Sequence, residues 1–131
     1  MIRMFRPLVH RRAWSAVSAL LLLGVIVGSL VPGSTVPSMG ASDKLLHFAA
    51  YAFLALWFGG LSHREAHGRV VLGLLLLGAL LEVLQGVFAL HRTADLRDLL
   101  ANALGIAFGM MLARTIAEAW TEKVEAWVGG A

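Results

Sequence analysis

Polar side chains interrupt the apolar runs of this sequence at spacings that keep each group on one helix face. Asp43, Lys44 and His47 form the first group, and steps of four and three residues lead to His47. Glu82 and Gln85 form the second group, three residues apart within a run of leucines and valines. The third group follows at the next turn and comprises Arg92, Asp95, Asp98 and Asn102. We expect the three groups to converge on one site.

Glu82 is the residue whose position most needs an explanation. It lies well inside an apolar run, and a charged side chain at membrane depth costs on the order of 2.5 kcal/mol or more unless it is paired. The carboxyl group must therefore be protonated or have a partner, for which Arg92 is the candidate. A buried Glu82–Arg92 ion pair would need no chemistry. A catalytic interpretation makes His47 the base, with Glu82 and Asp98 as the other catalytic residues.

The remaining members of the three groups have structural interpretations as well. His47 and Gln85 could be hydrogen-bonding residues between helices, whereas Asp95 and Asp98 could cap the first turn of a helix. Lys44 could be an interfacial anchor. As a set, carboxylates beside an amide oxygen could hold a hard divalent cation, and Lys or Arg beside them could receive a phosphate. The candidate binding residues are Asp43, Lys44, Gln85, Arg92, Asp95 and Asn102, and the sequence leaves the metal and any other cofactor open.

The composition indicates the kind of protein that must position these groups. Hydrophobic residues make up 59% of the 131 residues and charged residues 15%, whereas soluble domains carry about 25% charged residues. The absence of cysteine excludes disulfides and thiolate chemistry. The formal net charge is +3, but the arginines lie at the ends of apolar runs rather than on one stripe, which argues against nucleic-acid binding. We therefore expect an integral membrane protein.

Four apolar runs predict an all-α, four-helix transmembrane bundle that forms a single domain over residues 1–131. The expected helices are residues 13–31, 42–61, 70–90 and 97–115. The first run would span about 28 Å as a helix, close to the ~30 Å hydrocarbon core, and is longer than the apolar part of a signal peptide. Residues 116–128 predict an amphipathic C-terminal segment that lies on the membrane surface or packs on loops. Its apolar stripe consists of Ile116, Trp120, Val124 and Trp127.

Basic residues are distributed unequally between the two sides of this bundle. The side with both termini and the loop 62–69 holds Arg3, Arg6, Arg11, Arg12, Arg64, Arg69, Arg114 and Lys123, and the other side holds Lys44, Arg92 and Arg97. The positive-inside rule then puts both termini in the cytoplasm. The three polar groups consequently fall in the outer half of the membrane, and His63 and His67 of the loop are expected to be solvated.

Small residues recur at close-packing spacing in two of the expected helices. Gly24 and Gly28 form a GxxxG pair in the first helix. A longer stripe in the fourth helix consists of Ala101, Gly105, Gly109 and Ala113. Such stripes let two helix backbones approach closely. The contact could lie within the bundle or with a partner protein, and the sequence does not distinguish these alternatives.

The polar groups and their order resemble the VanZ-like family of small bacterial membrane proteins. The matching stretches are Ser42-Asp43-Lys44-Leu45-Leu46-His47-Phe48 with Tyr51, then Glu82-Val83-Leu84-Gln85, and then Arg92-Thr93-Ala94-Asp95 continuing through Asp98, Asn102 and Gly105 to Gly109. The resemblance covers residues 15–115 in outline. It implies a multi-pass protein of the cell membrane, in a family named after a member linked to resistance to the glycopeptide teicoplanin. It implies no particular reaction.

Two functional hypotheses follow from these observations. In the first, the protein acts at the outer face of the membrane and binds or modifies an anionic envelope component, such as a lipid-linked phosphate, with a link to glycopeptide resistance. In the second, it is a non-enzymatic accessory subunit whose small-residue stripe packs against a larger membrane complex. The lipid bilayer is a partner in both, and whether the chain is an enzyme is left open.

Overall fold

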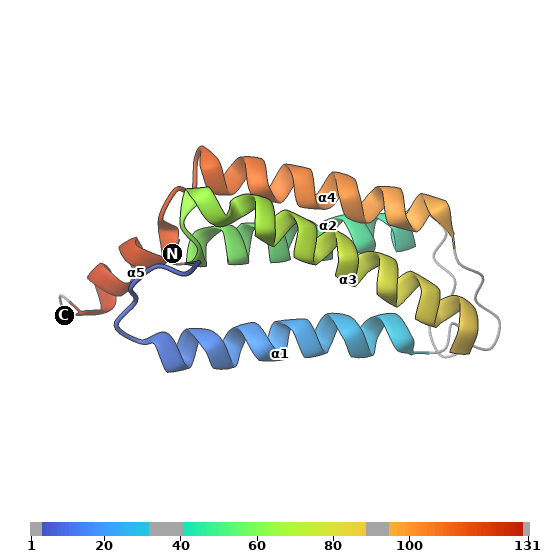
Figure 1. Cartoon of the computed structure of the whole chain (residues 1–131), viewed down its shortest axis with the longest axis horizontal. Coiled ribbons are helices and arrows are strands. Elements are labelled where there is room, and N and C mark those ends of the chain that lie inside the picture. Colours follow the sequence, from blue (N-terminus) through green and yellow to red (C-terminus); the bar gives the residue numbers. More distant parts are fainter. Residues whose placement is uncertain (1–3, 32–40, 89–94, 130–131) are drawn as a thin grey trace.

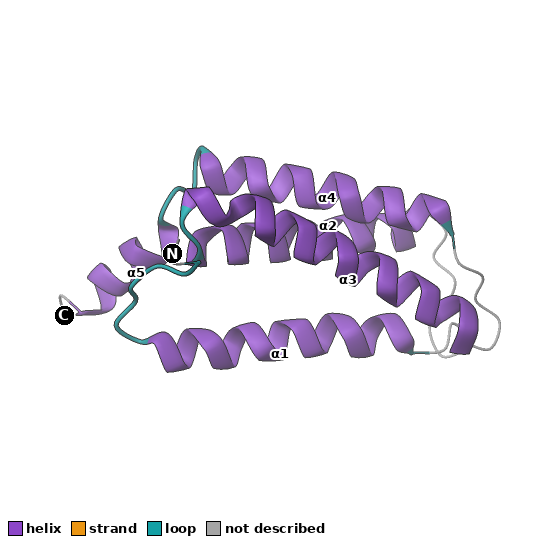
Figure 2. Ribbon diagram, viewed as in Figure 1, coloured by secondary structure: helices purple, strands orange, loops and turns teal. Residues whose placement is uncertain are grey.

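The computed structural model describes residues 4–31, 41–88 and 95–129, and these residues are almost entirely helical (Figure 1). The elements are α1 (Arg11–Leu30), α2 (Ala41–Leu61), the short 3₁₀ helix η1 (Arg64–Ala66), α3 (His67–Phe88), α4 (Leu96–Arg114) and α5 (Trp120–Gly129). The described segments contain no strand (Figure 2). The expected all-α fold class is confirmed.

Within the described ranges, four segments have the length and hydropathy needed to cross a bilayer: Arg11–Leu30, Asp43–Leu61, Arg64–Phe88 and Leu96–Arg114. Their mean hydropathies are 2.1, 1.4, 2.3 and 1.4. Large apolar side chains cover their outward faces, and Leu20, Leu76 and Leu104 are 67%, 62% and 55% exposed. A surface of this kind is unfavourable in water and is what lipid tails accept. The chain is therefore a multi-pass membrane protein.

α2 and α4 are in close contact, because two glycines of α4 bring the helix backbones together. A Cβ built at Gly105 would lie 2.3 Å from the Phe48 carbonyl oxygen, and one built at Gly109 would lie 2.0 Å from that of Ala52. The small-residue stripe of α4 therefore packs within the bundle. The apolar core beside this contact consists of Tyr51, Leu54, Ala55, Val70, Leu74, Ile106, Met110 and Ala113.

α1 lies at the edge of the bundle, and Ser18 is the one residue of this helix that is buried. Near the other end of α1, the Gln85 Nε2–H donates to the Ser29 carbonyl oxygen at 2.6 Å. A Cβ at Gly24 or Gly28 would meet no atom within 4 Å. Within the described part of the chain this glycine pair makes no close helix contact, unlike the stripe of α4.

The N-terminal segment and α5 meet at one end of the bundle (Figure 1). Glu125 of α5 accepts hydrogen bonds from the backbone N–H groups of Val9 and His10, both at 2.7 Å, and from Trp14 Nε1 at 2.9 Å. The Trp14 ring also packs edge-on against Trp120, with the ring centroids 5.6 Å apart. The last helix is thus fastened to the start of the first one.

The amphipathic C-terminal segment does not continue α4. The chain turns through residues 115–119, where Ala119 has a φ of 53°, and the helix resumes at Trp120. Trp120 faces the bundle and donates from Nε1 to the Leu56 carbonyl oxygen at 3.2 Å, whereas Trp127 is 81% exposed. The turn reorients the helix, so residues of the expected stripe face different surroundings.

His67 is buried, which corrects the expectation that it is solvated. α3 begins at this residue, which is 2% exposed. Its Nε2–H donates to the Gly59 carbonyl oxygen at 3.0 Å, and its Nδ1 accepts from Arg114 Nε at 3.1 Å. Because both ring nitrogens have partners, the imidazole ties the start of α3 to the end of α2 and the end of α4.

Candidate functional site

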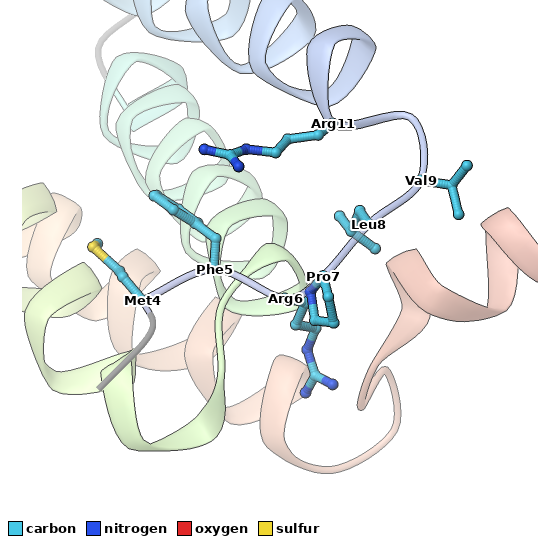
Figure 3. A pocket seen from close by; sticks show the side chains of 7 residues that line it. All are labelled: Met4, Phe5, Arg6, Pro7, Leu8, Val9 and Arg11. Carbon is cyan, nitrogen blue, oxygen red and sulfur yellow. The ribbon is translucent and has the colours of Figure 1, made fainter. Parts of the chain in front are cut away.

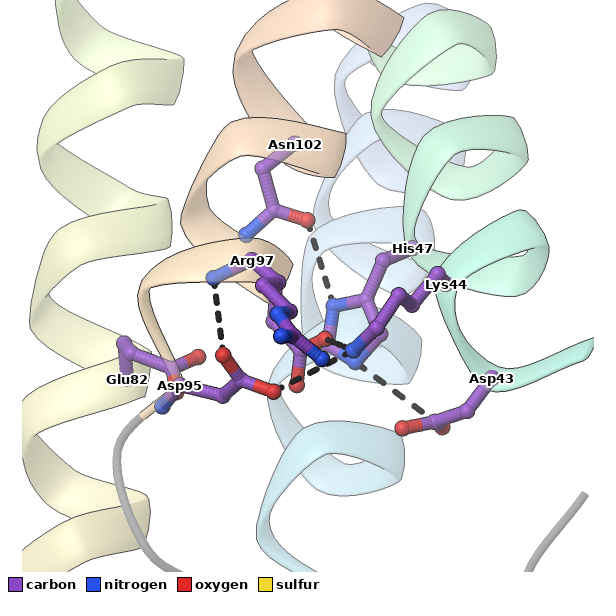
Figure 4. A network of polar contacts seen from close by, with 8 residues as sticks. Asp43, Lys44, His47, Glu82, Asp95, Arg97 and Asn102 are labelled. Carbon is purple, nitrogen blue, oxygen red and sulfur yellow. Dashed lines mark hydrogen bonds and ion pairs between the residues drawn. The ribbon is translucent and has the colours of Figure 1, made fainter. Parts of the chain in front are cut away.

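Polar side chains gather at the end of the bundle opposite α5, where α2 and α4 begin and α3 ends (Figures 1 and 4). Lys44 joins α2 to the start of α4, because its Nζ donates to Asp95 Oδ2 at 3.2 Å and to Asp98 Oδ1 at 2.9 Å. We call this group the polar cluster, and its members are Asp43, Lys44, His47, Glu82, Asp95, Arg97, Asp98 and Asn102.

A buried amide orients the His47 ring. His47 Nδ1 lies 3.1 Å from Asn102 Oδ1, and Asn102 is only 2% exposed. Because an amide oxygen can only accept, Nδ1 carries the proton and the lone pair of the neutral ring is on Nε2. Nε2 lies 4.0 Å from Asp43 Oδ1, one turn earlier in α2. The imidazole is therefore held with Nε2 directed toward a carboxylate.

Glu82 connects α3 to the polar cluster through the backbone. Its side chain is 7% exposed, and Oε1 accepts the backbone N–H of Asp95 at 2.5 Å. This N–H belongs to the residue that caps α4, so the buried carboxylate helps to fix where that helix begins. The expected partner Arg92 lies outside the described residues.

Of two further α3 residues, Gly78 lies against the polar cluster and Gln85 does not. Gln85 points to Ser29 of α1, so it joins helices rather than entering the cluster. Gly78, which is not among the residues expected from the sequence, makes room for the cluster. A Cβ at this position would lie 3.2 Å from Asn102 Nδ2 and 3.3 Å from Tyr51 Oη. In the sequence, only its spacing of four residues from Glu82 indicates that Gly78 lies on the helix face of the cluster.

Asp95 caps α4 and stays ionised. Its Oδ1 accepts the backbone N–H of Arg97 at 2.8 Å, and this bond, followed by the pairing with Lys44, holds the pKa of the carboxyl below its ordinary value of 3.8. Arg97 is an exposed member of the cluster (Figure 4). It too is absent from the residues expected at the site, although its place between Asp95 and Asp98 would suggest it.

Three cluster residues have the donor atoms of a metal site. One atom each from Asp43, His47 and Asp98 lie within 4.8 Å of one another. Asp95 is not part of this set. Its carboxylate accepts from Arg97 and Lys44. The set combines two carboxylates with an imidazole, which is a ligand combination that divalent transition metals accept.

A separate cavity of about 600 Å³ lies at the other end of the molecule (Figure 3). Its lining comes from one stretch of chain: Met4, Phe5, Arg6, Pro7, Leu8, Val9 and Arg11. Arg6 is already paired there with Glu122, at 2.9 Å. None of the polar cluster residues lines this cavity.

The fold and the site together define a helical membrane protein with four candidate spans and a polar cluster where three of them meet. The chain belongs to the VanZ/LLP1 family, whose model matches residues 4–117. That range includes every member of the polar cluster. No curated protein and no solved structure matched the chain.

Proposed function

We propose that this protein acts at the outer face of the bacterial cell membrane, where the polar cluster binds or modifies an anionic, lipid-linked component of the envelope. The observation that carries the proposal is the double ion pair of Lys44 with Asp95 and Asp98, beside a buried Glu82. Ionisable groups at membrane depth are expensive and tend to be functional. A link to glycopeptide susceptibility belongs to the same proposal, since the resemblance to VanZ-like proteins implies it.

Two cationic side chains at the rim of the cluster would receive the anionic group. The Lys44 side chain is 39% exposed, and an ammonium has three N–H donors, so its two carboxylate partners do not exhaust it. Arg97 is exposed beside it, and a guanidinium binds phosphate oxygens in a bidentate manner. Arg92 belongs to the same proposal from the sequence, although it lies outside the described residues.

The deeper residues would orient the substrate or move a proton. His47, whose side chain is 14% exposed, presents Nε2 and is the candidate base. Glu82 and Asp98 are its proposed catalytic partners. Lys44 links Asp98 to Asp95, and the Asp95 backbone N–H donates to Glu82. A change in the charge or position of one of these groups would therefore affect the hydrogen bonds of the others.

The outer-face assignment is supported by the distribution of positive charge. The end with the N-terminal segment, η1 and α5 carries Arg6, Arg11, Arg12, Arg64, Arg69, Arg114 and Lys123, whereas the polar cluster end carries Lys44 and Arg97 among the described residues. Cytoplasmic loops are enriched in Lys and Arg. This distribution supports an extracytoplasmic position for the polar cluster.

The accessory-subunit alternative is weakened, because the small-residue stripe that favoured it has a contact within the bundle. The small-residue stripe of α4 is covered by α2, with Gly105 and Gly109 against the backbone of that helix. A surface that is already packed within the bundle is not available to a partner protein.

The proposal is tested in a bacterial host that depends on the protein. Variants Glu82→Gln, His47→Ala and Arg92→Ala are each expressed in place of wild type and compared for envelope integrity and teicoplanin susceptibility. Glu118→Gln is the matched control, because this exposed carboxylate pairs with Arg64 at the opposite end. We expect the three variants to differ from wild type in envelope integrity and teicoplanin susceptibility. The control should behave as wild type in both. If variants that reach the membrane at normal levels all behave as wild type, the proposal is refuted.

A further inference from the structure

We propose that Asp43, His47 and Asp98 bind a divalent transition-metal cation, and that this cation contacts the anionic group of the substrate. The second half of this inference rests on the proposed function, whereas the first half stands on the geometry alone. The donor atoms come from α2 and α4, the two helices whose backbones are in contact. The site would therefore lie on a pair of helices that are held together by a close backbone contact.

The separation of the donor atoms suits a shared cation. The three atoms lie within 4.8 Å of one another. Ligands on opposite sides of an ion that makes bonds of about 2.0–2.2 Å lie about 4.0–4.4 Å apart. Rotations of the two aspartate side chains, which are partly exposed, would close the difference without moving either helix.

The hydrogen bond of His47 is the one that metal-ligating histidines make. Such a histidine donates its second ring N–H to an oxygen, which fixes the tautomer and aims the other nitrogen at the metal. Here Nδ1 donates to the oxygen of the buried Asn102. The Nε2 lone pair then faces the Asp43 carboxylate at 4.0 Å. A cation bound between these two acceptors would take both as ligands.

The charge balance of the polar cluster favours a cation. Its described members carry carboxylates at Asp43, Glu82, Asp95 and Asp98, and cationic side chains at Lys44 and Arg97. Among the described members the carboxylates outnumber the cations, which weakens the attraction of Lys44 and Arg97 for a phosphate. A divalent cation would reverse the local charge and leave coordination positions for phosphate oxygens.

The ligand types indicate which cations to expect. Imidazole suits Zn²⁺ and other transition metals, whereas Ca²⁺ and Mg²⁺ prefer oxygen ligands alone. Two carboxylates and one imidazole therefore point to Mn²⁺ or Zn²⁺. The Lys44 ammonium lies 2.9 Å from Asp98 Oδ1 and would compete with the metal for it. Removing that ammonium should strengthen metal binding.

The test is a metal titration of the full chain in phosphatidylcholine nanodiscs after treatment with EDTA. Free Mn²⁺ is followed by its electron paramagnetic resonance signal, and Zn²⁺ binding by calorimetry. We expect one Mn²⁺ per chain, weakened at least about tenfold in both His47→Ala and Asp98→Asn, and tightened in Lys44→Met. The control His63→Ala removes a histidine outside the cluster and should bind as wild type. Elution volume and thermal midpoint confirm that each variant is folded.

Two results would overturn the metal site. One is the absence of stoichiometric Mn²⁺ and Zn²⁺ binding by wild type. The other is binding that persists unchanged in a folded His47→Ala or a folded Asp98→Asn variant, because the cation would then lie elsewhere. If both of these variants unfold, Lys44→Met decides the question, and unchanged affinity in that variant counts against the site.

The substrate half of the inference has its own readout. A polyprenyl phosphate is added to the nanodiscs, with the polyprenyl alcohol as the uncharged control. We expect the phosphate, and not the alcohol, to increase the apparent Mn²⁺ affinity of wild type. Metal binding without this increase overturns only the bridging role. Metal binding together with wild-type behaviour of the host variants refutes the proposed function and leaves the metal site standing.

Discussion

Lys44 Nζ of α2 lies 2.9 Å from Asp98 Oδ1 of α4, and this ion pair joins the starts of two helices whose backbones touch further along. The contact at Gly105 and Gly109 decides how close the two helices come. The ion pair and the His47–Asn102 hydrogen bond lie on the same helix pair. Packing in the middle of the bundle therefore determines the geometry of the site at its end.

Gly109→Ala should destabilise the protein by about 1–3 kcal/mol, because it inserts a methyl group into a close contact. The new Cβ would lie 2.0 Å from the Ala52 carbonyl oxygen, and backbone atoms cannot rotate away. Gly24→Ala is the matched control, since a Cβ there meets no atom within 4 Å. Unfolding in mixed micelles should show a change within about 0.5 kcal/mol for the control. Equal stability of the two variants would contradict the α2–α4 contact.

Glu82→Ala and Glu82→Gln should separate the structural role of this residue from a chemical one. Alanine leaves the Asp95 N–H without its acceptor, which should cost about 1–3 kcal/mol of stability. Glutamine keeps an acceptor oxygen and should retain most of the stability while losing the charge. Stability is measured by unfolding in mixed micelles. A Glu82→Gln variant as unstable as Glu82→Ala would show that the charge, rather than the hydrogen bond, supports the fold.

Asn102→Ala should weaken Mn²⁺ binding by about 10–100-fold, the usual effect of removing the partner that orients a histidine ligand. The Asn102 side chain touches the His47 ring at Nδ1 and not at Nε2, so the ligand atoms themselves are unchanged. Asn102→Asp keeps an acceptor oxygen and should bind at least as tightly as wild type. The measurement is the Mn²⁺ titration described above, and equal affinities in the two variants would argue against the orienting role.

Acid should loosen the contact between α5 and the start of α1. Burial favours the neutral form of Glu125, but hydrogen bonds from His10, Val9 and Trp14 outweigh it and hold the pKa of the carboxyl below its ordinary value of 4.5. A carboxylate with a lowered pKa stabilises the fold above the ordinary value and loses that contribution as the pH falls through the folded-state value. The protection factors of the Val9 and His10 amides should therefore fall on acidification below pH 4.5.

Glu125→Gln provides the comparison for this pH dependence. Glutamine has one acceptor oxygen where Glu125 uses both of its oxygens, so protection should already be reduced at neutral pH and should change little on acidification. Protection factors that follow the wild-type pH profile in this variant would assign the effect to another group.

Orientation can be measured directly, because the sequence has no cysteine and any introduced thiol is unique. Leu96→Cys marks the polar cluster end at a residue that is 78% exposed, and Trp127→Cys marks the α5 end at one that is 81% exposed. A membrane-impermeant maleimide added to intact spheroplasts should label position 96 and leave position 127 unlabelled until the membrane is opened. The reverse pattern would place the polar cluster in the cytoplasm.

The sequence by itself determined the long apolar helices that are the candidate membrane spans of the described chain. Long apolar runs bounded by charged or turn-forming residues can satisfy their backbone hydrogen bonds in lipid only as helices, and this requirement is local to each run. The same local reasoning identified most of the polar cluster, because ionisable residues such as Glu82 stand out in an apolar run. It also indicated the resemblance that the family match to residues 4–117 confirms.

Only the tertiary structure decided which groups meet. Sequence patterns gave Gly24–Gly28 and Gly105–Gly109 similar packing roles, yet only the second pair faces another helix closely. Gln85 turned to α1, and His67 became buried between α2 and α4. Such outcomes depend on the rotation and depth of each helix relative to its neighbours. Those quantities are set by side-chain packing between segments distant in the chain, so no single segment encodes them.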